Sequence, residues 1–148
     1  MKLQDKLSTM KGTLTINVIN RSGETTATHV WNNLITTVGY SAAAQALAGV
    51  SGAKVASIGM GVNATPPKLT DTALSSAVTK PFTTIAYNPD TTPAVQFNFT
   101  IDFLDAVGMT IFEWGLITQD GRLFSRLTRA PIQKTNEMML VGHWLINM

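Results

Sequence analysis

The sequence predicts a mainly β protein, an antiparallel β-sandwich or flattened barrel of about eight strands with one helix. Short runs in which apolar and polar residues alternate recur along the chain, as they do in strands with one buried face. Turn-forming residues separate these runs at the spacing of hairpins. Apolar residues at helical spacing occur in a single stretch, roughly residues 37–48.

Length and composition suit one domain, because 148 residues can bury a sizeable core. Charged residues make up 14% of the chain, against roughly 25% in ordinary soluble domains. A surface poor in charge suggests that partner chains cover part of it. The abundant Thr, Asn and Ser offer another explanation, since they can solvate a β surface.

Several classes of function are not expected from the composition. The chain has no cysteine, so disulfides and thiolate metal sites are unavailable. The first residues lack the apolar core of a signal peptide, and no apolar run approaches the roughly 18 residues of a membrane span. Lys and Arg are dispersed rather than gathered in a basic stripe, so direct nucleic-acid binding is not expected.

The N-terminal part predicts an arm followed by a hairpin. Residues 1–11 alternate in charge without a clear period and are expected to form a mobile or partner-docked arm. Residues 13–19 and 24–31 alternate as strands on either side of a turn that ends at Gly23. The pair Asn32-Asn33 is expected to end the second strand.

The helix is expected to begin near Thr37 and end near Ala48. The helix is predicted from apolar residues that repeat at helical spacing, namely Leu34, Val38, Ala42 and Ala46, with Leu47 beside them. Thr36 or Thr37 is placed to cap its start, and Gly49 stands where the C′ residue of a helix belongs.

The remaining strands follow from alternation and turn signals. They are predicted over residues 55–62, 82–87, 95–103, 110–118, 122–128 and 138–148. In residues 95–103 the apolar side chains of Val95, Phe97, Phe99, Ile101 and Phe103 share one face. Residues 63–72 and 130–137 are expected to be long loops, and residues 73–79 a further connection.

The hairpin of residues 110–128 is expected to lie at the centre of the domain. Asp120-Gly121 supplies residues that tolerate positive φ at its turn. Phe112, Trp114 and Leu116 point to one face of its first strand, and Glu113 lies between them on the other.

Glu113 is the carboxylate that most requires a partner, because burying an unpaired carboxylate in an apolar strand is costly. Arg122 and Arg126 on the returning strand are the candidates. We therefore predict a structural ion pair between Glu113 and one of these arginines rather than an acid–base catalyst.

Other residues that catalysis or metal binding would use are dispersed. His29 and His143 are interpreted as ordinary half-buried residues, and Asp102 and Asp105 as solvated surface. Gly59-Met60-Gly61 lacks the third glycine and the helix of a dinucleotide-binding turn, so close packing explains it better. No catalytic residue, cofactor or metal is predicted.

The three tryptophans leave a carbohydrate-binding function as an alternative. Trp31, Trp114 and Trp144 are interpreted as core, as aromatic residues on strands usually are. A carbohydrate-binding β-sandwich instead predicts that at least two of them are exposed on one surface.

An ordered set of motifs resembles tail-fibre and baseplate-associated proteins of tailed bacteriophages. It comprises Leu34-Ile35-Thr36-Thr37-x-Gly39 before an alanine-rich helix, Ser57-Ile58-Gly59-Met60-Gly61, Thr65-Pro66, Thr70-Asp71-Thr72-Ala73-Leu74, and Glu113-x-Gly115-Leu116 with Asp120-Gly121-x-Leu123. Their order and spacing hold from about residue 34 to 126. In tail fibres a long shaft and a receptor-binding tip usually follow such a region, and this chain is expected to lack both.

The resemblance implies a structural subunit of a phage particle, assembled in the host cytoplasm. Its expected place is the tail, collar, baseplate or a fibre adaptor, and capsid decoration is the alternative. The expected partners are copies of the chain, as a trimer or hexamer, and other virion proteins. The family offers no catalytic residue to carry over, so an enzyme is not predicted.

Overall fold

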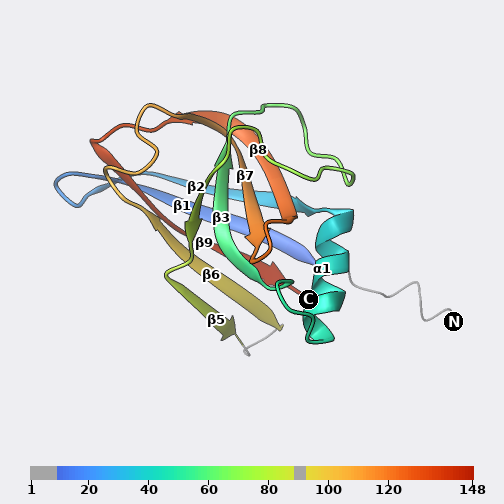
Figure 1. Ribbon diagram of the computed structural model, residues 1–148. Coiled ribbons are helices and arrows are strands. Elements are labelled where there is room, and N and C mark those ends of the chain that lie inside the picture. The colour runs from blue at the N-terminus through green and yellow to red at the C-terminus, as the bar shows by residue number, and fades with distance from the viewer. Residues whose placement is uncertain (1–9, 89–92) are drawn as a thin grey trace, which may run out of the picture.

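The computed structural model describes residues 10–88 and 93–148, and its strands form one curled antiparallel sheet (Figure 1). The strands are β1 (Lys11–Asn20), β2 (Thr25–Ile35), β3 (Val55–Gly61), β4 (Val78–Pro81), β5 (Thr84–Asn88), β6 (Ala94–Ile101), β7 (Thr110–Thr118), β8 (Leu123–Gln133) and β9 (Met138–Asn147). They are ordered β4-β3-β7-β8-β2-β1-β9-β6-β5. The predicted fold class, a mainly β flattened barrel with one helix, is confirmed.

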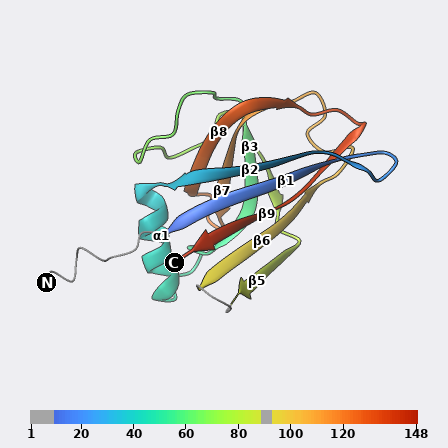
Figure 2. The same cartoon turned by 180° about the vertical axis from the view of Figure 1, so that it is seen from behind.

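The sheet curls far enough for its two edge strands to be consecutive parts of one segment. β4 pairs with β3 and β5 pairs with β6, and only Phe82 and Thr83 lie between β4 and β5. The Phe82 N–H donates to the Ala56 carbonyl at 3.2 Å, whereas the Thr83 N–H donates to the Asn98 carbonyl at 2.8 Å. These two residues therefore join the edges of the sheet, and Figure 2 shows the curled strands from behind.

The core lies inside the curl, between its two halves. Phe99 on β6 and Trp114 on β7 meet there with their ring centroids 6.4 Å apart. Leu14 and Ile16 on β1 and Trp144 on β9 are also fully buried. The alternating pattern of β6 thus places its apolar side chains in the interior, as its sequence predicts.

The helix α1 (Thr37–Leu47) lies across one end of the curl, beside the C-terminus (Figures 1 and 2). Thr36 caps it, because its Oγ1 accepts a hydrogen bond from the Gly39 N–H at 2.8 Å. Gly49 has φ +78°, as the predicted C′ residue requires. Within the described part of the chain no helix has the length and apolar character needed to cross a membrane.

Several predicted strand bounds are wrong. Residues 78 and 79, expected in a connection, belong to β4, and the strand expected over residues 95–103 ends at Ile101. The second strand does not end at Asn32-Asn33 but continues to Ile35, because Asn33 lies opposite Gly12, where no side chain competes for its space. Residues 130–133, expected to be a loop, belong to β8, since they pair with the start of β7.

Of the predicted N-terminal arm, the structure describes residues 10 and 11. Lys11 already belongs to β1 and pairs with Asn147, so the arm does not extend to residue 11. Met10 packs against the core. Residues 1–9 lie outside the described residues.

The alternation predicts that Phe112 shares the buried face of Trp114 and Leu116, but in the structure it does not. The register between β7 and β8 shifts between Ile111 and Glu113. Ile111 is consequently in the core with Trp114 and Leu116, whereas Phe112 remains partly exposed.

Candidate functional site

Glu113 and Arg126 form a buried ion pair between two neighbouring strands. Arg126 Nε donates to Glu113 Oε1 at 2.8 Å, and the side chains are 2% and 0% exposed. Glu113 comes from β7 and Arg126 from β8, which pair as a hairpin. Because both charges are fully removed from water, each requires further hydrogen bonds to offset its desolvation.

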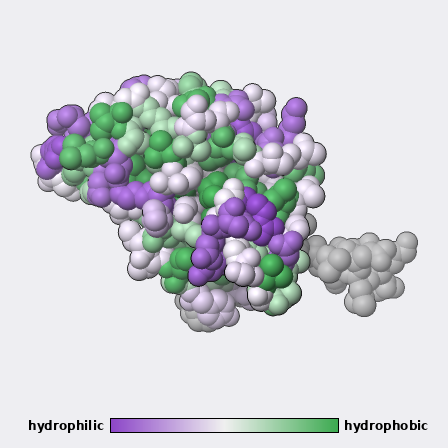
Figure 3. Space-filling view, viewed as in Figure 1, coloured by the Kyte–Doolittle hydropathy of each residue, from purple (hydrophilic) through white to green (hydrophobic). Residues whose placement is uncertain are grey.

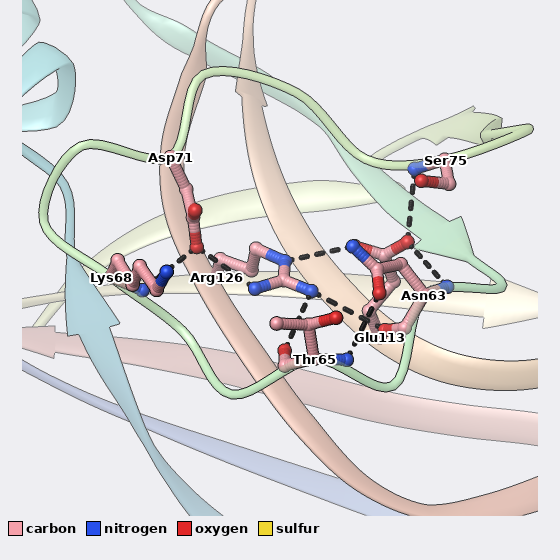
Figure 4. A network of polar contacts seen from close by, with 7 residues as sticks. All are labelled: Asn63, Thr65, Lys68, Asp71, Ser75, Glu113 and Arg126. Atoms are coloured by element: carbon pink, nitrogen blue, oxygen red, sulfur yellow. Dashed lines mark hydrogen bonds and ion pairs between the residues drawn. The ribbon is translucent and has the colours of Figure 1, made fainter.

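These further hydrogen bonds all come from the connection between β3 and β4, which we call the 62–77 loop (Figure 4). Glu113 Oε2 accepts from the backbone N–H groups of Asn63 at 2.8 Å and Ser75 at 2.9 Å. Arg126 Nη2 donates to the carbonyl of Thr65 at 3.0 Å. One ion pair therefore holds both ends of a long loop.

Asp71 completes this network from the middle of the loop. Its Oδ2 accepts from Arg126 Nη1 and from the Lys68 N–H, each at 2.8 Å. Burial raises the pKa of Asp71, but the hydrogen bonds from the Lys68 N–H and Arg126 outweigh that effect and hold it below its usual range. Asp71 is consequently a carboxylate at neutral pH.

Three glycines provide the space for this loop. A Cβ on Gly61 would overlap Glu113 Oε2, so the bare backbone lets the carboxylate lie against β3. Gly59 and Gly115 face each other across β3 and β7, and a Cβ on Gly59 would lie 2.7 Å from Leu74 Cδ1. The predicted reading of Gly59-Met60-Gly61 as a close-packing device thus fits the contacts of both glycines.

Arg122, the other predicted partner of Glu113, lies elsewhere. Its Nε donates to Asp120 Oδ1 at 3.0 Å and its Nη1 to Gln45 Oε1 at 2.7 Å. Of the two candidate arginines, Arg126 and not Arg122 therefore pairs with Glu113. Asp120 and Gly121 form the hairpin turn, with Gly121 at φ +90°.

A second buried cation was not singled out from the sequence. Lys134 is fully buried, and its Nζ donates to the carbonyls of Asp102, Phe103 and Thr135 at 3.0, 3.2 and 2.9 Å. Desolvation lowers its pKa below the ordinary value, although Asp105 and Asp102 oppose that effect. Nothing in its sequence context distinguishes this lysine from the others.

Asp102 and Asp105 both contact Lys80 rather than standing alone in solvent. Lys80 Nζ donates to Asp102 Oδ2 at 3.1 Å and also to Asp105 Oδ2. These pairs tie β4 to the connection between β6 and β7. Asp102 is largely exposed and Asp105 about one-third exposed, so we assign both a structural role.

The histidines and tryptophans do not converge on a site. His29 stacks on Trp31 with ring centroids 4.9 Å apart, and His143 lies on β9. Among the residues that the structure describes, no group of three His, Asp or Glu is placed to hold a metal. Trp114 and Trp144 are buried, so the two exposed tryptophans that a carbohydrate platform requires are not there.

A mostly apolar cavity of about 310 Å³ lies beside α1. Ala43 and Ala46 of α1 line one side, and Ile85 of β5 and Phe97 of β6 line another. Its volume is about twice that of an apolar cavity of roughly 150 Å³ that binds benzene. Among the described residues that line it, Lys54 is the one group that could act as an acid, base or nucleophile.

The Glu113–Arg126 network is therefore suited to holding a loop and not to chemistry. The Glu113 oxygens already accept from Arg126, Asn63 and Ser75, and the carboxylate has no access to solvent.

The sequence matches no family model, and searches of curated proteins and of solved structures found no match.

Proposed function

We propose that this chain is a structural subunit of a tailed-phage particle, in the tail, collar, baseplate or a fibre adaptor, and acts through protein–protein interfaces. The observation that carries the proposal is the convergence of the motifs behind the phage resemblance. Three separate motifs contribute residues that hold the 62–77 loop against β3, β7 and β8, namely Glu113, Gly61, and Asp71 with Leu74. The motif set therefore describes one structural unit.

The use of these residues to hold the loop supports a role in assembly. The charged groups of Glu113, Arg126 and Asp71 are all hydrogen-bonded within this network, so these residues maintain the shape of the loop. Any function would then be carried out by the surface of the protein. This supports a non-enzymatic function.

The surface carries apolar side chains that an assembly could cover. Leu47 is 92% exposed and Leu104 79%, and Tyr87 and Val30 are also largely exposed. Obligate interfaces are richer in apolar area than ordinary protein surface. Copies of the chain, as a trimer or hexamer, and other virion proteins are the proposed partners.

Localisation in particles tests this proposal. An antibody raised against the chain is applied to purified particles of a phage that encodes it, with gold labelling in electron micrographs and quantitative mass spectrometry for copy number. Particles made without the chain are the control. Label at the tail or its junction, in a multiple of three or six copies, is expected.

Two other outcomes are decisive. Label spread over the head in many copies would replace the tail position with capsid decoration. Absence of the chain from the particles, while it is abundant in the infected cell, would overturn the proposal.

A further inference from the structure

The two end strands of the curled sheet differ in how their outer edges are protected. β4 carries Lys80 and Pro81, and a charge or a residue without an N–H usually keeps an edge strand from pairing with another chain. β5 has no such protection, because Thr84–Asn88 contains neither a charged residue nor a proline. Figures 1 and 2 show β5 as the last strand, beyond β6. The outer edge of β5 is therefore unguarded.

The pairing of β6 shows which backbone groups of β5 lie on this edge. The Met148 N–H donates to the Pro93 carbonyl at 3.0 Å, so the odd-numbered residues of β6 face β9 and the even-numbered ones face β5. Ala86 lies opposite an even-numbered residue of β6, so its N–H and C=O point into the sheet. The N–H and C=O groups of Ile85 and Tyr87 consequently point outward, where the described sheet has no further strand.

Ile85 and Tyr87 also expose their side chains, by 54% and 67%. Both lie on one face of β5, because side chains alternate along a strand. Ile85 lines the cavity beside α1, which places this face toward the inside of the curl. Strongly hydrophilic residues gather around the β1–β2 turn and beside α1 in the view of Figure 3, and fewer lie at the lower margin, where β5 runs. A strand added to this edge would pair these backbone groups and cover both side chains.

The backbone and the side chains of β5 together select the occupant. Alternating N–H and C=O groups on a strand edge are matched by the main chain of another extended strand. A second β5 also matches the side chains. In an antiparallel pair about a twofold axis at Ala86, Ile85 of each copy lies opposite Tyr87 of the other. Pairs of a β-branched and an aromatic residue across strands are favourable, and the axis forms two of them at once.

We propose that β5 pairs with β5 of a second copy of this chain, antiparallel and about a twofold axis at Ala86, so that the two curled sheets become continuous. The inference rests on the proposed assembly function and specifies one of its interfaces. Five residues a side is far fewer than the roughly 20–30 of a stable complex, so free chains should associate weakly through it. The contact is expected to form where an assembly already holds copies close together.

Disulfide trapping tests this pairing, because the chain has no cysteine and one introduced thiol reports on one position. Ala86 and its copy would form a pair without hydrogen bonds, with Cα atoms about 4.5 Å apart, which a disulfide can bridge. Thr84→Cys is the matched control, since Thr84 is exposed on the same face of the same strand. It would lie opposite Asn88, so the two copies of residue 84 would be roughly 14 Å apart, too far for a disulfide.

With a mild oxidant and protein at up to about 1 mM, the effective concentration of linked neighbours, Ala86→Cys is expected to give a linked dimer. Thr84→Cys is expected not to. Adding Tyr87→Lys to Ala86→Cys should slow linking on the order of tenfold, because it puts a charge on the edge and removes the aromatic partner of Ile85. Adding Leu104→Lys, on a highly exposed leucine between β6 and β7, should leave the rate unchanged. Urea titration checks that all variants stay folded.

Three results would overturn the inference: no linked dimer from Ala86→Cys, equal linking of the two cysteine variants, and a Tyr87→Lys change that leaves the rate unaltered. If Ala86→Cys does not link, yet the Ile85 and Tyr87 amides are protected from hydrogen exchange in particles, a strand of another virion protein is the occupant instead. Failure to link in a chain that particles contain refutes this contact while the proposed function stands. Linking by a chain that particles lack refutes the function alone.

Discussion

The 62–77 loop and the connection of residues 102–109 each lie over a buried cation, but the two cations bind different kinds of partner. Arg126 faces the carboxylates of Glu113 and Asp71 and also bonds the loop carbonyl of Thr65. Among the described residues, Lys134 donates its hydrogen bonds to three carbonyls, those of Asp102, Phe103 and Thr135. The planar guanidinium serves several acceptors in different directions, whereas the ammonium is a point charge over one cluster of carbonyls.

This difference indicates what each loop loses when its cation is removed. Without Arg126, a buried carboxylate remains at Glu113 with no opposite charge, which is among the costliest defects in a protein interior. Without Lys134, neutral carbonyls lose a donor, and a charge that was costly to bury leaves with it. The first loop should therefore depend more strongly on its cation than the second.

Replacing Arg126 by Met should produce the largest effect. The free energy of unfolding, from urea titration, is expected to fall by about 3–5 kcal/mol because Glu113 stays buried and charged. Adding Glu113→Gln to this variant should restore part of the loss. A loss under roughly 1 kcal/mol for Arg126→Met, or no recovery in the double variant, would show that the pair is not the anchor.

Replacing Gly61 by Ala should rank second. The new Cβ would overlap the Glu113 carboxylate, which three donors hold in place, so a loss of about 1–3 kcal/mol is expected. Gly59→Ala is the matched control, because the nearest atom in its way is the flexible end of Leu74, followed by the side chain of Ile117, and no charged group is in contact. Equal losses for the two variants would mean that Glu113 moves as freely as Leu74.

Replacing Lys134 by Met should cost less than replacing Arg126, about 1–2 kcal/mol in the same urea titration. Three carbonyls lose their donor, but a desolvated charge is removed. A loss as large as that of Arg126→Met would remove the distinction between the two anchors.

The free energy of unfolding should depend on pH differently for the two loops, and these are the smallest effects expected. The pKa of Asp71 is lowered in the folded protein, so its contribution is present above the ordinary value of 3.8 and is lost as pH falls through the folded pKa. The stability difference between wild type and Asp71→Asn, about 1 kcal/mol at pH 7, should therefore shrink in acid.

Lys134 should respond at the other end of the scale. Its pKa is lowered in the folded protein, so the unfolded chain binds more protons just below the ordinary value of 10.5, and stability should rise with pH there. Relative to Lys134→Met, the wild type is expected to gain stability in this alkaline window. A relative loss would mean that the carbonyls outweigh desolvation.

The sequence carries enough information for most of the strands, with β4 as the exception, and for one partner of the ion pair. Glu113 is conspicuous because it interrupts an apolar strand. Gly121 is conspicuous because a tight turn requires a positive φ at that position. The choice between Arg122 and Arg126 depends on the pairing of β7 with β8, which shifts register twice. Alternation within one strand does not reveal such shifts, and Phe112 was misplaced for the same reason.

The contacts of the 62–77 loop were beyond sequence reasoning for a related cause. Its hydrogen bonds to Glu113 come from the backbone N–H groups of Asn63 and Ser75, which every residue except proline possesses. Lys134 likewise bonds carbonyls, so no complementary side chain marks it. Likewise, β2 passes through Asn33 because Gly12 lies opposite it on another strand.

Amide hydrogen exchange at Ser75 tests most directly whether the buried ion pair holds the loop. Ser75 itself is exposed, yet its N–H donates to the fully buried Glu113 carboxylate. Its amide is predicted to exchange as slowly as the paired amides of β7, and to lose that protection in Arg126→Met. Exchange in the wild type at the rate of an unprotected loop amide would contradict the account.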